Sequence, residues 1–181
     1  MTVLSIGSDL RPLAERAAAG DSDSLADLLA ELRPAIVRVA RLVVGPGTWA
    51  AEDAAQDALV DITRGIASLR EPGAVRSWAM KIAVSRALKV ARRERLKPIS
   101  LGLRDVPELV APARDDQLRD TDLKRAFYRL PPRMRAIAIL RLHVGLSEAE
   151  TARLVGVGVG TAKSQLHEAR KRLARQLTDT T

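Results

Sequence analysis

The sequence predicts an all-α protein made of two small helical domains joined by a flexible acidic linker. Its 181 residues are 46% hydrophobic, which supplies enough apolar material for packed cores. Aromatic residues make up only 2%, so Ala, Leu, Val and Ile must build those cores, and short amphipathic helices suit this composition. Helical periodicity breaks near the middle of the chain, where prolines and acids gather. We therefore expect an N-terminal domain over residues 1–97, a linker over 98–117 and a C-terminal domain over 118–181.

Three helices are expected in the N-terminal domain. Residues 21–24 can cap the first, which Pro34 should kink and the glycines and proline of 45–47 should end. Thr48 can cap the second, whose apolar residues recur at helical spacing. A third helix over about 75–95 follows a Pro-Gly turn and is strongly basic.

The C-terminal domain contains a predicted helix-turn-helix. A helix over 118–130 ends at two prolines, and the next helix stops at Gly145. Ser147 and Glu150 then form a capping-box pattern that opens a short helix, and Gly156 is placed to end it in a left-handed conformation. A last helix runs from 159 to about 176, so two helices are joined by a glycine-containing turn.

The net charge of +8 and the pI of about 10.7 favour a polyanionic partner, although a membrane surface or solubility alone could also explain them. The net charge is +3 over residues 1–97, −3 over 98–122 and +8 over 123–181. The basic excess therefore lies mainly in the C-terminal third, and an acidic segment separates it from the basic third helix.

Several functional classes are disfavoured. The chain has no cysteine and two histidines, so we expect no disulfide, metal centre or cofactor. No run of roughly 18 apolar residues and no signal-like N-terminus occur, which predicts a cytoplasmic protein without membrane insertion. Ser164, His167 and Glu168 are the residue types of a hydrolase triad, but one helix displays all three without an oxyanion site. We therefore expect no enzymatic activity.

The last helix has a polar face opposite its inner stripe. If this helix enters a major groove, its polar side chains point at base edges and phosphates, and the small residues Gly160 and Thr161 let the backbone approach DNA. The alternative is a helical hairpin with a solvated basic face, which the agreement of caps, turn and charge disfavours.

The third and second helices carry two further candidate surfaces. Trp78 shares a face with basic residues of the third helix, which suits melting or single-stranded DNA, although Trp78 can equally be a core residue. On the second helix Asp53, Gln56 and Asp57 share a face that could pair with a basic partner helix. Alternatively, these acids only complement the helix dipole.

Three motifs together resemble a known family. Residues 130–133 (LPPR), 146–152 and 159–173 (VGTAKSQLHEARKRL) resemble the C-terminal promoter-reading domain of sigma factors, and 51–58 (AEDAAQDA) resembles the signature of their first domain. Trp78 with Ile82 and Ala83 resembles the region that reads and melts the promoter −10 element. The chain is thus identified as resembling extracytoplasmic-function sigma factors of bacterial RNA polymerase.

The resemblance implies three sets of contact residues. The first domain would dock on the coiled coil of the polymerase β′ clamp, and the second would read the −35 element and contact the β flap. The polymerase contacts would be Glu52, Asp53, Gln56 and Asp57. The −10 contacts would be Arg76, Trp78, Lys81, Ile82, Ser85, Lys89, Arg92 and Arg93. The −35 contacts would be Gly160, Thr161, Lys163, Ser164, His167, Glu168, Arg170 and Lys171.

The resemblance also defines the expected partners and function. The chain would bind core RNA polymerase and promoter DNA and direct transcription initiation, and an anti-sigma factor joins the expected partners because such inhibitors are common in this group. The acidic linker would run near the active-site channel and RNA exit path. The alternative is a helix-turn-helix regulator that binds duplex DNA without being a polymerase subunit, with the N-terminal helices used for dimerisation or sensing.

Overall fold

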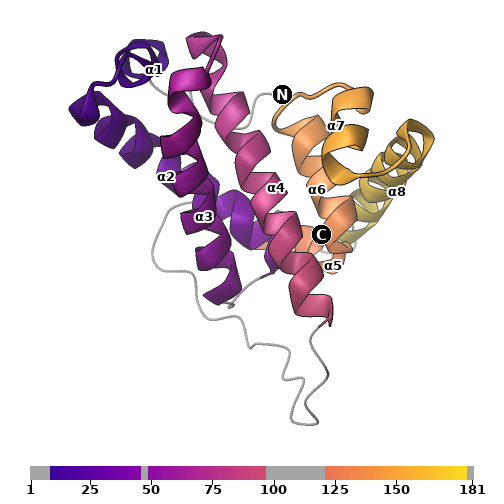
Figure 1. Cartoon of the computed structure of the whole chain (residues 1–181). Coiled ribbons are helices and arrows are strands. Elements are labelled where there is room, and N and C mark those ends of the chain that lie inside the picture. Colours follow the sequence, from indigo (N-terminus) through magenta and orange to yellow (C-terminus); the bar gives the residue numbers. More distant parts are fainter. Residues whose placement is uncertain (1–8, 46–48, 97–120, 179–181) are drawn as a thin grey trace.

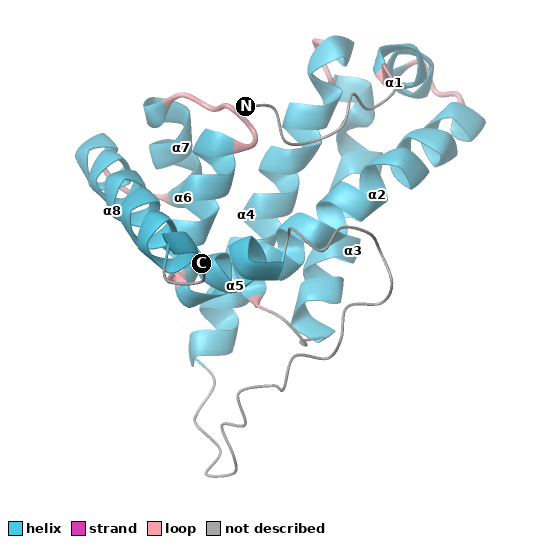
Figure 2. Ribbon diagram, turned by 180° about the vertical axis from the view of Figure 1, so that it is seen from behind, coloured by secondary structure: helices cyan, strands magenta, loops and turns pink. Residues whose placement is uncertain are grey.

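A computed structural model describes residues 9–45, 49–96 and 121–178, and every regular element in these ranges is helical. The all-α prediction is confirmed (Figures 1 and 2). The predicted linker, residues 98–117, lies outside the described residues, and so does the predicted cap residue Thr48. The elements are α1 (Arg11–Ala18), α2 (Ser22–Val44), α3 (Trp49–Gly65), the 3₁₀ turns η1 (Ile66–Ser68) and η2 (Pro72–Ala74), α4 (Val75–Leu96), α5 (Thr121–Arg129), α6 (Pro132–Leu142), α7 (Glu148–Val155) and α8 (Val159–Thr178).

Helices α2, α3 and α4 form the body of the N-terminal half, and α1, which the sequence pattern did not reveal, packs on α2 and the 3₁₀ turns. The Asp21 carboxylate caps α2 by accepting hydrogen bonds from the backbone N–H of Asp23 at 3.1 Å and of Ser24 at 3.4 Å. Its hydrogen bonds with the Ser24 hydroxyl and backbone N–H lower the pKa of Asp21. Helix α2 continues through Pro34 and ends at Gly45, whose φ of 131° suits glycine alone.

Alanine allows the three long helices to approach closely. Helix α3 buries Ala51, Ala54, Ala55 and Ala58 on one face, and these small side chains let its backbone lie near α2 and α4. Larger residues, including Ile36, Ile62 and Val84, fill the remaining volume and are fully buried. The core therefore has few aromatic residues and is instead filled by small side chains that pack closely.

Helices α5 to α8 form the C-terminal half, and its predicted caps are present. The Ser147 hydroxyl accepts a hydrogen bond from the backbone N–H of Glu150 at 3.2 Å, and the Ser147 backbone N–H donates to the Glu150 carboxylate at 2.9 Å. Gly156 ends α7 with φ 72° and ψ 51°, a left-handed cap. The helix-turn-helix prediction is confirmed in α7, the glycine turn and α8.

The two halves share one apolar core. Ile137, Leu140 and Val155 of the C-terminal half belong to the same buried cluster as Leu32 and Val84 of the N-terminal half. Figures 1 and 2 both show α4 lying between α2 and α3 on one side and α6 on the other. The sequence predicted two domains but not this contact, because it joins residues far apart along the chain.

In the described part of the chain, no helix is long and apolar enough to span a membrane.

Candidate nucleic-acid interface

Helix α8 presents a continuous polar surface directly opposite its buried face. Ala162, Leu166, Ala169 and Leu173 are buried, so the helical repeat turns the remaining positions outward. Among the expected −35 contacts Glu168 is half-buried, and the others are exposed: Gly160, Thr161, Lys163, Ser164, His167, Arg170 and Lys171. The structure thus brings this set together on one helix face.

The start of α8 is open. A Cβ atom added at Gly160 would meet no atom within 4 Å, so another molecule can approach the backbone here. The Ser164 hydroxyl donates a hydrogen bond to the Thr161 carbonyl at 3.0 Å and keeps its lone pairs as acceptors. The position therefore suits close backbone contact with a phosphate.

Glu168 is already paired on its own helix. Its carboxylate accepts a hydrogen bond from the Arg172 guanidinium at 2.7 Å, and this bond is the main reason that the pKa of Glu168 is lowered. Among the expected −35 contacts, the exposed cations are Lys163, Arg170 and Lys171. These cations give α8 the charge that phosphate contacts require.

Most of the expected −10 contacts share one face of α4. Trp78, Lys81 and Ile82 are half-buried, whereas the following residues of the face are exposed: Ser85, Lys89, Arg92 and Arg93. Arg76 is also exposed but stands two residues before Trp78, and positions two apart point to opposite sides of a helix. The structure therefore groups seven of the eight expected residues and separates Arg76 from them.

Trp78 serves partly as a core residue. It packs against the shared apolar cluster, and a Cβ atom added at Gly65 would lie 3.1 Å from its ring. Glycine at the end of α3 thus allows the ring to lie close to that helix. The core interpretation of Trp78 is supported, and its half-exposure leaves part of the side chain accessible.

Two of the expected −10 residues contact the C-terminal half. The Lys81 ammonium lies 3.6 Å from the Glu150 carboxylate, and the Arg92 guanidinium donates a hydrogen bond to the Val155 carbonyl at 2.9 Å. Both contacts join α4 to α7, the first helix of the helix-turn-helix. In this arrangement DNA phosphates would compete with α7 for these cations.

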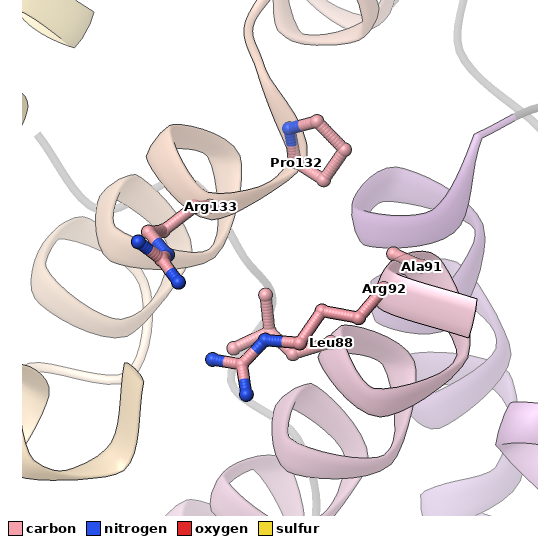
Figure 3. Close-up of a pocket in the computed structure, with 5 residues that line it drawn as sticks. All are labelled: Leu88, Ala91, Arg92, Pro132 and Arg133. Atoms are coloured by element: carbon pink, nitrogen blue, oxygen red, sulfur yellow. The ribbon is translucent and has the colours of Figure 1, made fainter. Parts of the chain in front are cut away.

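A cavity of about 240 Å³ lies beside this contact, between α4 and the start of α6 (Figure 3). Leu88, Ala91 and Arg92 line it from α4, and Pro132 and Arg133 line it from α6. Figure 3 shows the Arg92 side chain extending from α4, with Pro132 and Arg133 at the start of α6. The C-terminal half therefore covers the end of α4 incompletely.

The four expected polymerase contacts on α3 differ in their surroundings. Asp53 and Gln56 are exposed. Glu52 accepts hydrogen bonds from Arg41 of α2 at 2.7 and 3.0 Å, and Asp57 lies 3.9 Å from Arg86 of α4. Asp53 and Gln56 are thus the members of this set best placed to meet a partner.

Sequence reasoning missed the ion pair that joins α3 to α4. The Arg86 guanidinium donates two hydrogen bonds to the Asp61 carboxylate, at 2.5 and 2.6 Å, and this bidentate pair raises the pKa of Arg86. The two residues are 25 positions apart, so no local spacing rule could have paired them. Arg86 therefore holds α3 and α4 together, although it lies among the basic residues of α4.

No cofactor or metal site was expected. Among the described residues no group of three or more His, Cys, Asp or Glu side chains is arranged to hold a metal ion.

The sequence matches the family model of sigma-70 region 2 over residues 28–96 and that of sigma-70 region 4 over residues 121–173. A region 2 followed by a region 4 defines a class of promoter-recognising proteins, the sigma-70 type. The chain belongs, more narrowly, to the extracytoplasmic-function sigma factors of bacterial RNA polymerase.

Curated relatives support this assignment. The chain is 37% identical over 160 residues to the ECF RNA polymerase sigma factor SigM of Mycobacterium tuberculosis, covering 88% of this chain and 80% of SigM. It is 31% identical over 126 residues to the RNA polymerase sigma factor SigV of Bacillus subtilis, covering 70% of this chain and 75% of SigV.

Two solved structures share the fold. The sigma factor RpoE of Bartonella quintana, solved with the anti-sigma factor NepR, is 26% identical with a TM-score of 0.62, covering 84% of this chain and 96% of RpoE. CnrH, solved with the cytosolic domain of CnrY, is 20% identical with a TM-score of 0.59, covering 96% of this chain and all of CnrH.

Proposed function

We propose that this chain acts as a dissociable sigma subunit that binds core RNA polymerase and directs it to promoters. Residues 1–97 would hold the polymerase and open the −10 element, and residues 118–181 would read the −35 element. The observation that carries the proposal is the exposed, cation-bearing face of α8 within a chain that matches both region 2 and region 4.

Each surface has a separate role in this proposal. The major groove of duplex DNA at the −35 element would receive α8, with Lys163, Arg170 and Lys171 contacting phosphates and Ser164 and His167 reaching base edges. The Trp78 face of α4 would contact the −10 element as its strands separate. The acidic surface of α3 would dock on a basic helix of the polymerase.

The chain itself would catalyse no reaction, because RNA synthesis belongs to the polymerase. Cytoplasmic localisation is proposed because polymerase and chromosomal DNA are found there. An anti-sigma protein is a further proposed partner, since the similar sigma factor RpoE was solved in complex with one.

The test is transcription in vitro with sigma-free bacterial core polymerase, the purified chain and a random DNA library from which promoters are selected. We expect transcripts with defined start sites. Asp53→Arg should abolish them together with core binding, whereas Asp27→Arg, the same charge change at an exposed position of α2, should leave them unchanged. Tight duplex binding without transcription or core association would instead identify a helix-turn-helix regulator.

A further inference from the structure

Trp49 has the highest exposed fraction among the large apolar side chains that the structure describes. It is 88% exposed at the first position of α3, and Val60 of the same helix is 45% exposed. An indole side chain gains a large apolar contact area when a partner covers it, so an exposed one is a candidate interaction point.

The two apolar residues lie on one stripe of α3. Trp49, Asp53, Gln56 and Val60 follow one another at intervals of four, three and four residues, which keeps them on one helix face over about 16 Å. The opposite face holds the buried alanines of α3. We call these four residues the α3 stripe, and it points directly away from the core.

The polar residues of the α3 stripe are available to a partner. Asp53 has no salt bridge within the described part of the chain, whereas the neighbouring acids Glu52 and Asp57 face Arg41 and Arg86. The stripe therefore combines an indole, a carboxylate, an amide and a valine, all in contact with solvent. An aromatic anchor bordered by polar groups is typical of an energetic hot spot.

We infer that Trp49 anchors the contact between α3 and a basic helical surface of core RNA polymerase. Val60 makes an apolar contact with the same surface at the other end of the α3 stripe. This inference rests on the proposed function. Charge selects the partner: Asp53 favours a basic surface, and a cation of that surface can also stack on the indole. A second copy of the chain presents the same carboxylate and fits less well. The apolar residues continue the acidic α3 surface already assigned to docking.

The test measures affinity of the full chain for sigma-free core polymerase. The sequence has no cysteine, so Thr181→Cys provides a unique dye position, and fluorescence anisotropy reports binding. Trp49→Ala should weaken binding roughly thirtyfold, the effect of removing a hot-spot side chain, and Trp49→Phe should restore part of the affinity. The matched control is Leu142→Ala, another exposed apolar residue, which should change affinity less than about twofold.

Salt dependence separates the anchor from its charged neighbour. Trp49→Ala removes mainly apolar contact, so the factor by which it weakens binding should depend far less on ionic strength than the factor for a charge change. Asp53→Arg should weaken binding most at low salt, because it replaces an attraction by a repulsion. Thermal unfolding of Trp49→Ala should match that of the parent chain, since the indole is exposed.

The outcomes distinguish the inference from the proposed function. If Asp53→Arg loses core binding and Trp49→Ala does not, the inference is overturned and the docking role of α3 stands. If neither variant binds more weakly than a parent chain that binds core polymerase, the inference and the docking role of α3 are both overturned. A parent chain that does not bind core polymerase overturns the proposed function. If sedimentation shows a dimer that Trp49→Ala dissociates while core affinity is unchanged, the stripe joins two copies of the chain and the inference is wrong.

Discussion

Lys171 illustrates how a single exposed cation of α8 can be tested. It lies on the face that we assign to the −35 element, so replacing it removes about one phosphate contact. We expect Lys171→Ala to weaken holoenzyme binding to all promoter sequences about equally and to reduce the slope of log affinity against log salt by about one. The control Arg16→Ala removes an exposed cation from α1 and should change neither quantity.

A base-contacting residue should behave differently. His167→Ala should change which −35 sequences are preferred while the salt slope stays nearly constant, because the proposed role of this side chain is a hydrogen bond to a base edge rather than a phosphate contact. Selection of promoters from a random library with each holoenzyme measures this. A Lys171→Ala variant that changed base preference as much as His167→Ala would contradict the division of roles on α8.

Glu150 connects helix capping to pH. Hydrogen bonds from the Ser147 backbone N–H and hydroxyl, followed by the charge of Lys81, lower the pKa of Glu150 in the folded chain. A carboxyl group whose pKa is lower when folded stabilises the protein above its unfolded pKa of about 4.3. This contribution is lost as pH falls through the folded pKa.

Unfolding by urea at several pH values tests this linkage. The free energy of unfolding of Glu150→Gln should depend less on pH below about 5 than that of the parent chain. Glu148→Gln is the matched control, because this neighbouring acid lies in the same first turn of α7. Parallel pH profiles for Glu150→Gln and the parent would show that the capping carboxylate is not linked to stability.

At the scale of elements, the Arg86–Asp61 pair fixes α4 against α3. Both side chains are about 30% exposed or less, and the bidentate geometry is favourable. A double-mutant cycle of Arg86→Ala and Asp61→Ala should give a coupling free energy of about 1 kcal/mol in urea unfolding. The Arg11–Glu15 pair is the control, because its side chains are 59% and 51% exposed. Its coupling should stay at or below about 0.5 kcal/mol.

The helix elements themselves could largely be predicted from the sequence. The capping box at Ser147, the left-handed Gly156 and the Asp21 cap all appear where local patterns indicated, because each motif involves residues within a few positions of one another. Helix α1 was missed, since it is short and its N-cap residue, Leu10, makes no side-chain cap. Periodicity alone gives little information about such a helix.

At the scale of the whole molecule, the two halves of the described chain share one apolar cluster, so we expect them to unfold together. Leu140 of α6 is fully buried in the cluster shared by both halves. We expect Leu140→Ala to lower the free energy of unfolding by about 2–5 kcal/mol. Because the core is shared, hydrogen exchange should become faster in α2 and α4 as well as in α6 and α8.

Leu173→Ala provides the comparison, because Leu173 belongs to a second cluster formed within the C-terminal half. It should accelerate exchange mainly in α5, α6 and α8. If Leu140→Ala also left exchange in α2 and α4 unchanged, the two halves would unfold independently and the shared core would contribute no cooperativity.

Most of the candidate contact residues share the helix faces that the sequence predicted, but their surroundings could not be predicted from the sequence. The polar face of α8 follows from helical spacing alone, and the structure shows it exposed. By contrast, the Lys81–Glu150 and Arg92–Val155 contacts join residues that belong to different halves of the chain. Trp49 was also overlooked, because an apolar residue at a helix start is ordinarily expected to pack inward.

The sequence by itself determined the helices other than α1, the caps at Asp21, Ser147 and Gly156, the helix-turn-helix and the basic character of α4 and α8, because these depend on residues within one or two helical turns. Only the tertiary structure decided which polar groups on different helices are paired with one another. Arg86 meets Asp61 across 25 residues and Arg92 meets Val155 across 63. Such contacts depend on how the shared apolar core brings distant helices together. The periodicity of the sequence does not predict which distant residues meet.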